Sequence, residues 1–434
     1  RTALSCTLLT TLLTSASAAK EISGNHNAFA VNGETVTIKS GATVGVGRAQ
    51  VGNAVSSNSS IVVSNNGNTS KSSITIEKDG RLNSRIFSSY QAKIKDIIIH
   101  GSIGAGPSNA SIINFRGTTI EKIEVGQTGV LEGGIINSWF KNGGVASGNS
   151  KIDNIDIKGE VKGGIKNQSG TMQTITITGS VSGGIQNDDT MGTLKIESGG
   201  SVSGDIINNK TMQSISVSNG TVNGNIVNSG TNANTGNISI TGTSNVGGSI
   251  INQNGANFTN SITLDQSSKL GGISNTQGST MSGTLTLNGE VGTIYNAGKF
   301  DSTLTLSNKV GEINNAEGGT ISNDITIQAN GSVGAINNSG TMQAITNNAT
   351  TGTLTLTNSG GTIDKITNGN GATATIRNQG KITNGIINDG GTLTVFNDFR
   401  KDESATNGYH TIGEIGKTAN GVHIENKNNG KLHL

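Results

Sequence analysis

The chain has 434 residues, of which 65 are glycine, 31% are hydrophobic, 13% are charged and only 3% are aromatic, and its formal net charge is +2. This composition supplies too little apolar and aromatic volume for several ordinary globular domains. The low net charge and the abundance of Ile, Val and Thr argue against a disordered chain, and no basic run supports nucleic acid as a partner. The composition therefore predicts a thin, elongated fold.

The N-terminal segment, residues 1–19, is typical of an export signal. It is apolar or hydroxylic from Ala3 to Ser15, and Ala16-Ser17-Ala18 fits the small-x-small rule for a signal peptidase. We expect the basic start of such a signal to be truncated here. The only cysteine, Cys6, lies inside this segment, so the exported chain could not form a disulfide bond. We expect an exported protein, located at the cell surface (outer membrane) or outside the cell.

Residues 20–90 repeat poorly and are predicted to form diverged N-terminal coils with a cap that protects the open edge of the fold. Residues 91–396 are predicted to be regular coils. Residues 397–434 are charge-rich and irregular, and we expect them to continue into a C-terminal portion that follows Leu434.

The regular region repeats the tripeptide Ile-x-Asn about every 21 residues. Short segments between the tripeptides, such as residues 174–178 and 214–218, alternate polar and apolar residues, which indicates strands with one buried face. About three strands fit into each repeat, so the predicted fold is all-β, a right-handed parallel β-helix (solenoid) with three-strand coils of about 21 residues. We expect about 19 coils, because roughly 400 residues remain after the signal segment.

The repeated asparagines are predicted to stack as a ladder, each amide bonding the next one. The first eight positions of this ladder are Asn137, Asn167, Asn187, Asn208, Asn228, Asn252, Asn275 and Asn296. The series continues at Asn315, Asn338, Asn368 and Asn388. A further Ile-x-Asn at residues 345–347 falls inside the long gap after Asn338 and predicts a partial coil.

Residues 138–150 interrupt the repeat and are predicted to form a projecting loop that carries Trp139 and Phe140. Two interpretations of this aromatic pair stay open. The rings could cover the side of a coil, or they could contact a partner surface.

The sequence gives no support for an enzyme, a metal site or a cofactor. None of the five histidines stands at metal-ligand spacing from a Glu or Cys. The best acidic group is Asp153, Asp156 and Glu160, and we expect Asp153 and Asp156 to face opposite sides because they are three residues apart on a strand. These carboxylates are predicted to be solvated and not catalytic.

The export signal, the cysteine-free repeats and the Ile-x-Asn coils resemble the passenger domains of Gram-negative autotransporters (type V secretion). The resemblance covers about residues 20–434 and is architectural. It implies an adhesin-like passenger that is followed by a membrane-inserted C-terminal β-barrel outside this sequence, the chain's sole link to a membrane.

The leading functional hypothesis is a surface-displayed adhesin or self-associating structural protein. Its partners would be host-cell or neighbouring bacterial surface molecules, other copies of itself included, and not nucleic acid. The alternatives are an extracellular β-helix enzyme that acts on polysaccharide and a toxin-like passenger.

Overall fold

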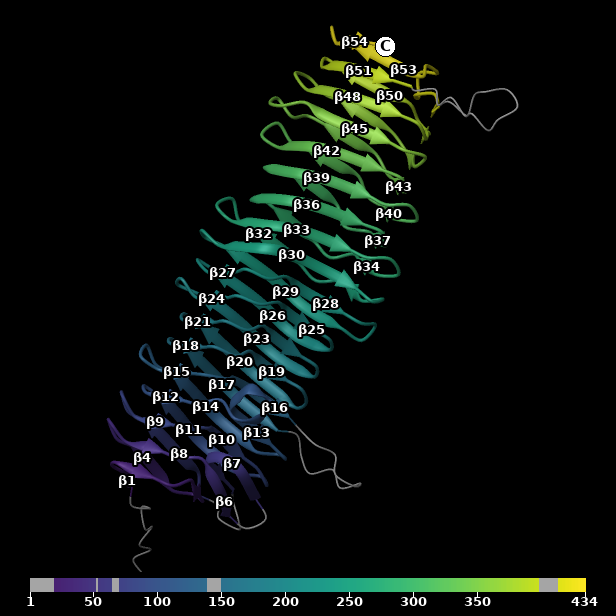
Figure 1. Cartoon of the computed structure of the whole chain (residues 1–434). Helices are drawn as coiled ribbons and strands as arrows, with labels where there is room; N and C mark the ends of the chain where they lie inside the picture. The colour runs from purple at the N-terminus through teal and green to yellow at the C-terminus, as the bar shows by residue number, and fades with distance from the viewer. Residues whose placement is uncertain (1–18, 52–53, 65–69, 139–149, 398–412) are drawn as a thin grey trace, which may run out of the picture.

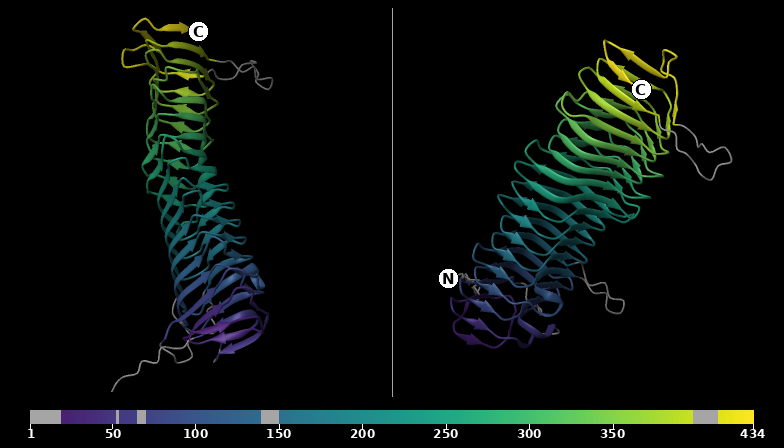
Figure 2. Two further views of the ribbon diagram at one scale, coloured as in Figure 1. Left: turned by 90° about the vertical axis from the view of Figure 1, so that its left-hand side faces the viewer. Right: turned by 45° about the horizontal axis from the view of Figure 1, so that its top comes forward.

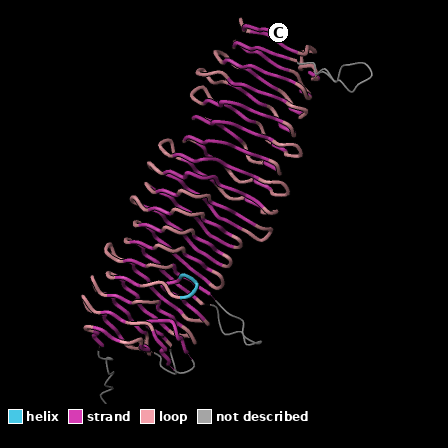
Figure 3. The backbone as a smooth tube through the Cα atoms, viewed as in Figure 1, coloured by secondary structure: helices cyan, strands magenta, loops and turns pink. Residues whose placement is uncertain are grey.

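The protein is a rod of stacked β-coils, which Figures 1 and 2 show from three directions. The computed structural model describes residues 19–51, 54–64, 70–138, 150–397 and 413–434. One coil cannot bury its own inward side chains, so each coil pairs in parallel with the coils before and after it. Strands dominate the backbone, and the single helical turn in the described ranges is η1 (Pro107–Asn109) (Figure 3). The predicted parallel β-helix is confirmed.

Sheet A receives one strand from every coil and has 18 strands. Eighteen strands are separated by 17 turns of chain, fewer than the 19 coils expected, and at about 4.8 Å per coil they span roughly 80 Å. The strands of sheet A are β1 (Lys20–Ile22), β4 (Thr35–Ile38), β8 (Ser72–Ile76), β11 (Lys93–Ile99), β14 (Thr119–Val125), β17 (Lys151–Ile157), β20 (Thr171–Ile177), β23 (Thr190–Glu197), β26 (Thr211–Ser218), β29 (Asn234–Thr241), β32 (Ile262–Leu264), β35 (Leu285–Leu287), β38 (Leu304–Leu306), β41 (Ile325–Ile327), β44 (Ile345–Asn347), β47 (Ile366–Asn368), β50 (Ile386–Asp389) and β53 (Ile424–Lys427).

Sheet B covers the opposite side of the rod and has 28 strands, because each early coil contributes two. They are β2 (Asn25–His26), β3 (Phe29–Val31), β5 (Thr43–Val44), β6 (Gly47–Val51), β7 (Ala54–Val63), β9 (Arg81–Leu82), β10 (Arg85–Ser88), β12 (Ser102–Ile103), β13 (Ala110–Phe115), β15 (Val130–Leu131), β16 (Gly134–Ser138), β18 (Glu160–Val161), β19 (Ile165–Asn167), β21 (Ser180–Val181), β22 (Ile185–Asn187), β24 (Ser201–Val202), β25 (Ile206–Asn208), β27 (Thr221–Val222), β28 (Ile226–Ser229), β30 (Asn245–Gln253), β33 (Lys269–Asn275), β36 (Glu290–Asn296), β39 (Lys309–Asn315), β42 (Ser332–Asn338), β45 (Leu354–Asn358), β48 (Thr373–Asn378), β51 (Thr392–Phe396) and β54 (Lys431–His433).

Sheet C exists only in the C-terminal half, where each coil adds a two-residue strand to it. Its strands are β31 (Asn257–Phe258), β34 (Thr280–Met281), β37 (Lys299–Phe300), β40 (Thr320–Ile321), β43 (Thr341–Met342), β46 (Thr362–Ile363), β49 (Lys381–Ile382) and β52 (Glu414–Ile415).

The inward side chains stack in rows along the rod axis. In one row, Ile175 pairs with Leu194, which pairs with Ile215, which pairs with Ile238. All four are at most 1% exposed. Burying one such side chain contributes about 1.5–3 kcal/mol, so a few inward positions per strand suffice, and the low apolar content of the sequence is explained.

The spacing between inward residues at the bends of a coil differs between the two halves of the rod. In the N-terminal half, successive inward residues are four apart where sheet B bends, as at Val181 and Ile185, and three apart in sheet A, as at Met172 and Ile175. In the C-terminal half the spacing is reversed: Val291 and Ile294 of sheet B are three apart, whereas the facing strands β34 and β35 place their inward residues four apart. We call this reversal the bend switch; it falls between β29 and β32.

The structure describes only part of the segments predicted to be the export signal and the diverged N-terminal coils. Residues 1–18 of the predicted signal lie outside the described ranges. Strands β1, β4 and β8 already stack in register, whereas β6 and β7 form an antiparallel pair on sheet B. No helix within the described ranges is both long enough and apolar enough to cross a membrane.

Candidate binding surface

The repeated asparagines form a continuous buried ladder. The eight predicted positions are all at most 3% exposed. Most neighbours are bonded directly: the Nδ2 of Asn167 lies 2.8 Å from Oδ1 of Asn187, and the Nδ2 of Asn187 lies 2.8 Å from Oδ1 of Asn208. The ladder holds the coils in register, and it has no free face toward solvent.

One step of the ladder runs through a threonine. Asn208 donates to the hydroxyl of Thr235 at 2.9 Å, and that hydroxyl donates to Oδ1 of Asn228, also at 2.9 Å. Thr235 pairs with Met212, so a hydroxyl stands where earlier coils have a thioether. The relay immediately precedes the bend switch.

The predicted partial coil at residues 345–347 is wrong, because Asn338 and Asn368 belong to different ladders. Asn338 bonds Asn358, 20 residues away, so the coil between them is complete. Asn347 starts a second ladder at the end of sheet A by donating to Asn368 at 3.0 Å, and Asn368 continues to Asn388. Both ladders are present in the last coils, and the single Ile-x-Asn series predicted from the sequence combines residues from the two.

Three partly exposed aromatic rings and two arginines gather on the outer face of sheet B in the N-terminal coils. We call Arg85, Phe87, Tyr90, Phe115 and Arg116 the aromatic–arginine cluster. The ring centroids of Phe87 and Phe115 are 5.8 Å apart. The guanidinium of Arg85 lies 5.5 Å from the Phe87 ring, and that of Arg116 lies 4.8 Å from the Tyr90 ring and 5.3 Å from the Phe115 ring. Aromatic residues and arginine are the types that dominate binding hot spots.

The local backbone brings these side chains together. Arg85 and Phe87 are two apart on β10 and therefore share its outer face. Phe87 pairs with Ile113 of β13, which places Phe115 of the same strand one coil further along. Tyr90 and Arg116 occupy the turns that follow these strands, with left-handed φ values of 54° and 51°. Non-glycine residues in this region are uncommon and collect at functional sites.

Both guanidiniums of the cluster are also held by hydrogen bonds. Arg85 donates from Nη1 to the Pro107 carbonyl at 3.0 Å and from Nε to the Ser59 hydroxyl at 3.2 Å, and its partial burial lowers its pKa. Arg116 donates to the hydroxyl of Tyr90. The cluster is thus preorganised and leaves most guanidinium N–H groups for a ligand.

Two of the three acidic residues singled out in the sequence are engaged in ion pairs along sheet A, and the third, Glu160, lies on β18 of sheet B. The Asp153 carboxylate lies 2.7 Å from Nζ of Lys151, and Asp156 lies 3.3 Å from Nζ of Lys158. The expectation that Asp153 and Asp156 face opposite sides is wrong. The inward residues Ile152 and Ile155 are three apart, so the strand shifts its alternation between them and both aspartates point outward.

Glu124 is the carboxylate whose ionisation the sheet changes most among those described. Nζ of Lys122 lies 2.6 Å from its Oε2, and Nζ of Lys158 lies 2.8 Å from its Oε1. Hydrogen bonds from these two lysines lower the pKa of Glu124 to about 2. In the parts of the chain that the structure describes, no group of three or more His, Cys, Asp or Glu side chains is placed to hold a metal ion.

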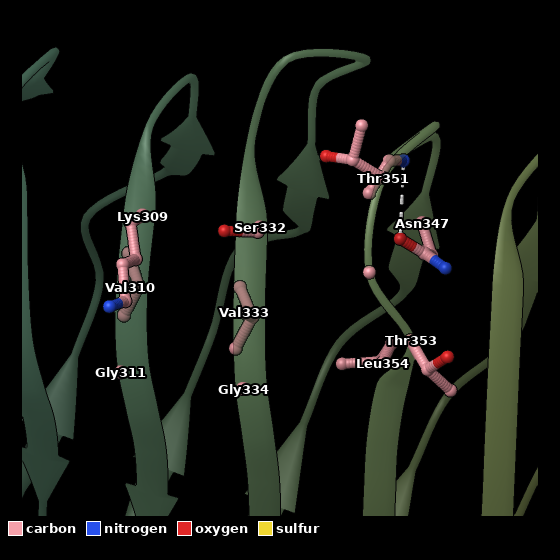
Figure 4. A pocket seen from close by; sticks show the side chains of 12 residues that line it. Lys309, Val310, Gly311, Ser332, Val333, Gly334, Asn347, Thr351, Thr353 and Leu354 are labelled. Carbon is pink, nitrogen blue, oxygen red and sulfur yellow. Dashed lines mark hydrogen bonds between the residues drawn. The ribbon is translucent and has the colours of Figure 1, made fainter.

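Two depressions lie over the glycine-rich bends of sheet B. One has a volume of about 200 Å³ and spans β39, β42 and the start of β45, where Val310, Val333 and Leu354 line it (Figure 4). The other, of about 390 Å³, spans β16 to β25 between Ile136 and Ile207. Glycines contribute to the lining of both, and the second depression also has Lys162, Lys166 and Asp205 in its lining.

The aromatic pair Trp139 and Phe140, for which covering a coil and contacting a partner were both open, lies outside the described residues. The sequence pattern does not predict the cluster, because Arg85, Phe87 and Tyr90 lie in the segment expected to be diverged coils and the other two members lie in the regular region. A signal was present: Arg85, Phe87 and Tyr90 place three large side chains within six residues of a chain that is 3% aromatic. Comparison of the sequence with protein families and with curated proteins gives no match.

Proposed function

We propose that this chain is an exported adhesin, a rod of the autotransporter-passenger kind that contacts molecules on host or neighbouring bacterial surfaces through the aromatic–arginine cluster. The observation that carries the proposal is the packing of Arg116 against both Tyr90 and Phe115 at the surface of a rigid scaffold. Such stacking holds large contact groups in place before a partner arrives, which lowers the entropic cost of binding.

The surroundings of the cluster support binding in preference to catalysis. An enzyme that cleaves polysaccharide would need carboxylates free for acid-base work. Asp153 and Asp156 are instead engaged with lysines on a regular sheet. The rod supports display, because its stacked coils carry the cluster on a stiff body roughly 80 Å long.

The proposal is tested by measuring adhesion of the purified rod to cultured epithelial cells and to bacteria. The double variant Phe115→Ala/Arg116→Ala removes the centre of the cluster, and we expect at least a tenfold loss of bound protein. A matched control exists near the other end of the rod, where Arg377 stacks 4.4 Å from the Phe396 ring. Arg377→Ala/Phe396→Ala removes a similar pair and should leave adhesion unchanged. Equal adhesion by both double variants would contradict the proposal.

A further inference from the structure

We propose that the partner of the aromatic–arginine cluster is an acidic polysaccharide, a linear glycan that carries carboxylate or sulfate groups. This inference rests on the proposed adhesive function and names the chemical class of its ligand. Its basis is an uncompensated line of arginines on sheet B.

The face around the cluster carries an excess of positive charge, and the nearest carboxylate along the chain, that of Asp79, lies two residues before Arg81 in an exposed turn. Residues 40–64, 80–92 and 101–118, which form sheet B and its turns in these coils, contain four arginines and no Asp, Glu or Lys. These are Arg48, Arg81, Arg85 and Arg116. Among the described residues none of the four forms an ion pair. The nearest glutamate along the chain, Glu77, is occupied by Lys39 at 2.7 Å.

The four arginines lie on three successive coils along the rod axis. Ser59 of β7 pairs with Gly47 on one side and with Arg85 on the other, so Arg48 and Arg85 flank β7. Arg81 precedes Arg85 on the same coil, and Arg116 belongs to the next one. Coils repeat at about 4.8 Å, so the charges form a line that suits a polymer with anionic groups at regular intervals.

The remaining exposed groups favour a hydroxylated ligand over a protein surface. Asn83, Ser108 and Asn109 are exposed beside the arginines and offer amides and a hydroxyl for hydrogen bonding. The apolar residues next to the cluster are buried: Ile113 and Ile136 are each only 8% exposed. The depression that begins at Ser108 and Asn109 is lined in part by Lys162, Lys166 and Asp205, so this face offers charged groups beside its apolar ones.

Duplex nucleic acid fits the line poorly. Affinity for a duplex comes largely from Lys and Arg side chains that neutralise its phosphates, and about 6–10 such contacts make it strongly salt-dependent. The line offers four guanidiniums, two of them stacked against rings. Guanidinium groups form bidentate hydrogen bonds with carboxylate as well as with other oxyanions, so both carboxylated and sulfated chains satisfy the chemistry.

The experiment measures binding of the purified chain to dextran, dextran sulfate and alginate by calorimetry or surface-based titration. Dextran and dextran sulfate share a backbone and differ in charge, and alginate carries carboxylates only. We expect binding to at least one of the two anionic chains, no binding to dextran, and an affinity that falls as NaCl is raised. Tighter binding to poly-glutamate or to duplex DNA than to either anionic polysaccharide would overturn the inference.

Two variants tie binding to the line of arginines. Arg85→Gln/Arg116→Gln should weaken binding to the anionic chain at least tenfold, whereas Arg377→Gln should not change it. Because Arg85 is partly buried, the exposed Arg81→Gln provides a variant that leaves packing intact, with an expected loss of about threefold. Unchanged affinity in both Arg85→Gln/Arg116→Gln and Arg81→Gln would overturn the inference.

Competition on cells separates this inference from the proposed function. Excess dextran sulfate or alginate should abolish adhesion of the wild-type rod. If adhesion depends on the cluster but neither polysaccharide competes, the adhesive function stands and the acidic-polysaccharide inference is overturned. If the polysaccharides bind through the arginines while adhesion is independent of the cluster, the inference stands and the proposed function fails.

Discussion

The side-chain amide of Asn187 donates a 2.8 Å hydrogen bond to Oδ1 of Asn208 in the next coil. The same amide also donates to the carbonyls of Asp189 at 3.0 Å and of Thr211 at 2.7 Å. Asn187 thus bonds its own turn and the next coil at once, in a place that water does not reach.

Replacing Asn187 by alanine should expose the cost of breaking this ladder. The amide of Asn167 loses its acceptor and several buried groups lose a partner, which costs about 2–3 kcal/mol. Amide hydrogen exchange in β22 and β25 should accelerate about 30- to 150-fold. Gln213→Ala, on the exposed face of sheet A, is the control and should leave exchange unchanged. A small effect of the Asn187 substitution would mean that the ladder contributes little to stability.

The stability contribution of Glu124 should depend on pH in a defined direction. Its pKa is lowered to about 2 from the usual 4.5, so its contribution is fully present above pH 4.5 and is lost as the pH falls toward 2. Because water screens both partly exposed lysines, we expect about 1 kcal/mol. The difference in urea midpoint between the wild type and Glu124→Gln should therefore be constant above pH 5 and shrink below 4.5. A difference independent of pH would show that the ion pairs are not its origin.

As a control for this measurement, Glu317→Gln changes an exposed turn residue for which no ion pair is seen in the described part of the chain. It should alter the urea midpoint very little at any pH between 2 and 7.

Phe300 should be a large contributor to the C-terminal half. It is fully buried and stacks between Met281 and Ile321 in sheet C. Phe300→Ala should cost about 3–5 kcal/mol through lost burial and a cavity. Phe300→Met restores the side chain that the preceding coil uses and should cost less than about 1.5 kcal/mol. Protease resistance of the C-terminal coils would report both values, and equal losses would refute a packing explanation.

Gly236 should be intolerant of any side chain. A Cβ at this position would overlap the Gln213 carbonyl of the preceding coil. We expect Gly236→Ala to separate the two coils locally, with a loss of about 2–3 kcal/mol. At Gly247 the nearest atom to a Cβ is a carbonyl oxygen at 3.3 Å, so Gly247→Ala should cost less than about 1 kcal/mol. Hydrogen exchange in β26 and β29 would distinguish the two variants.

Much of the architecture could be predicted because the coil is a local pattern. The Ile-x-Asn tripeptides place an inward isoleucine and a ladder asparagine at every turn, and no long-range information is needed to find them. The bend switch was harder to see. It depends on which sheet has its inward residues three apart, as at Met172 and Ile175, and which has them four apart, as at Val181 and Ile185. Both arrangements give coils of nearly the same length.

The candidate surface could not be predicted to the same extent. Arg116 and Tyr90 are 26 residues apart, and only the stacking of β10 and β13 brings them together. Even residues that are close in the sequence, such as Lys151 and the Asp153 that pairs with it, were not all placed correctly. Strict alternation placed Asp153 and Asp156 on opposite faces, but the three-residue spacing of the core isoleucines overrides it.

The bend switch limits how this protein can change in length during evolution. Within either half, a coil contacts only neighbours with the same bend, so gene duplication or loss of one coil preserves every inward row. Recombination could join a coil from before β29 directly to one from after β32. In sheet B, inward residues that are four apart would then stack on inward residues that are three apart. Related proteins should therefore vary in the number of coils within each half, while the junction between β29 and β32 is inherited as a unit.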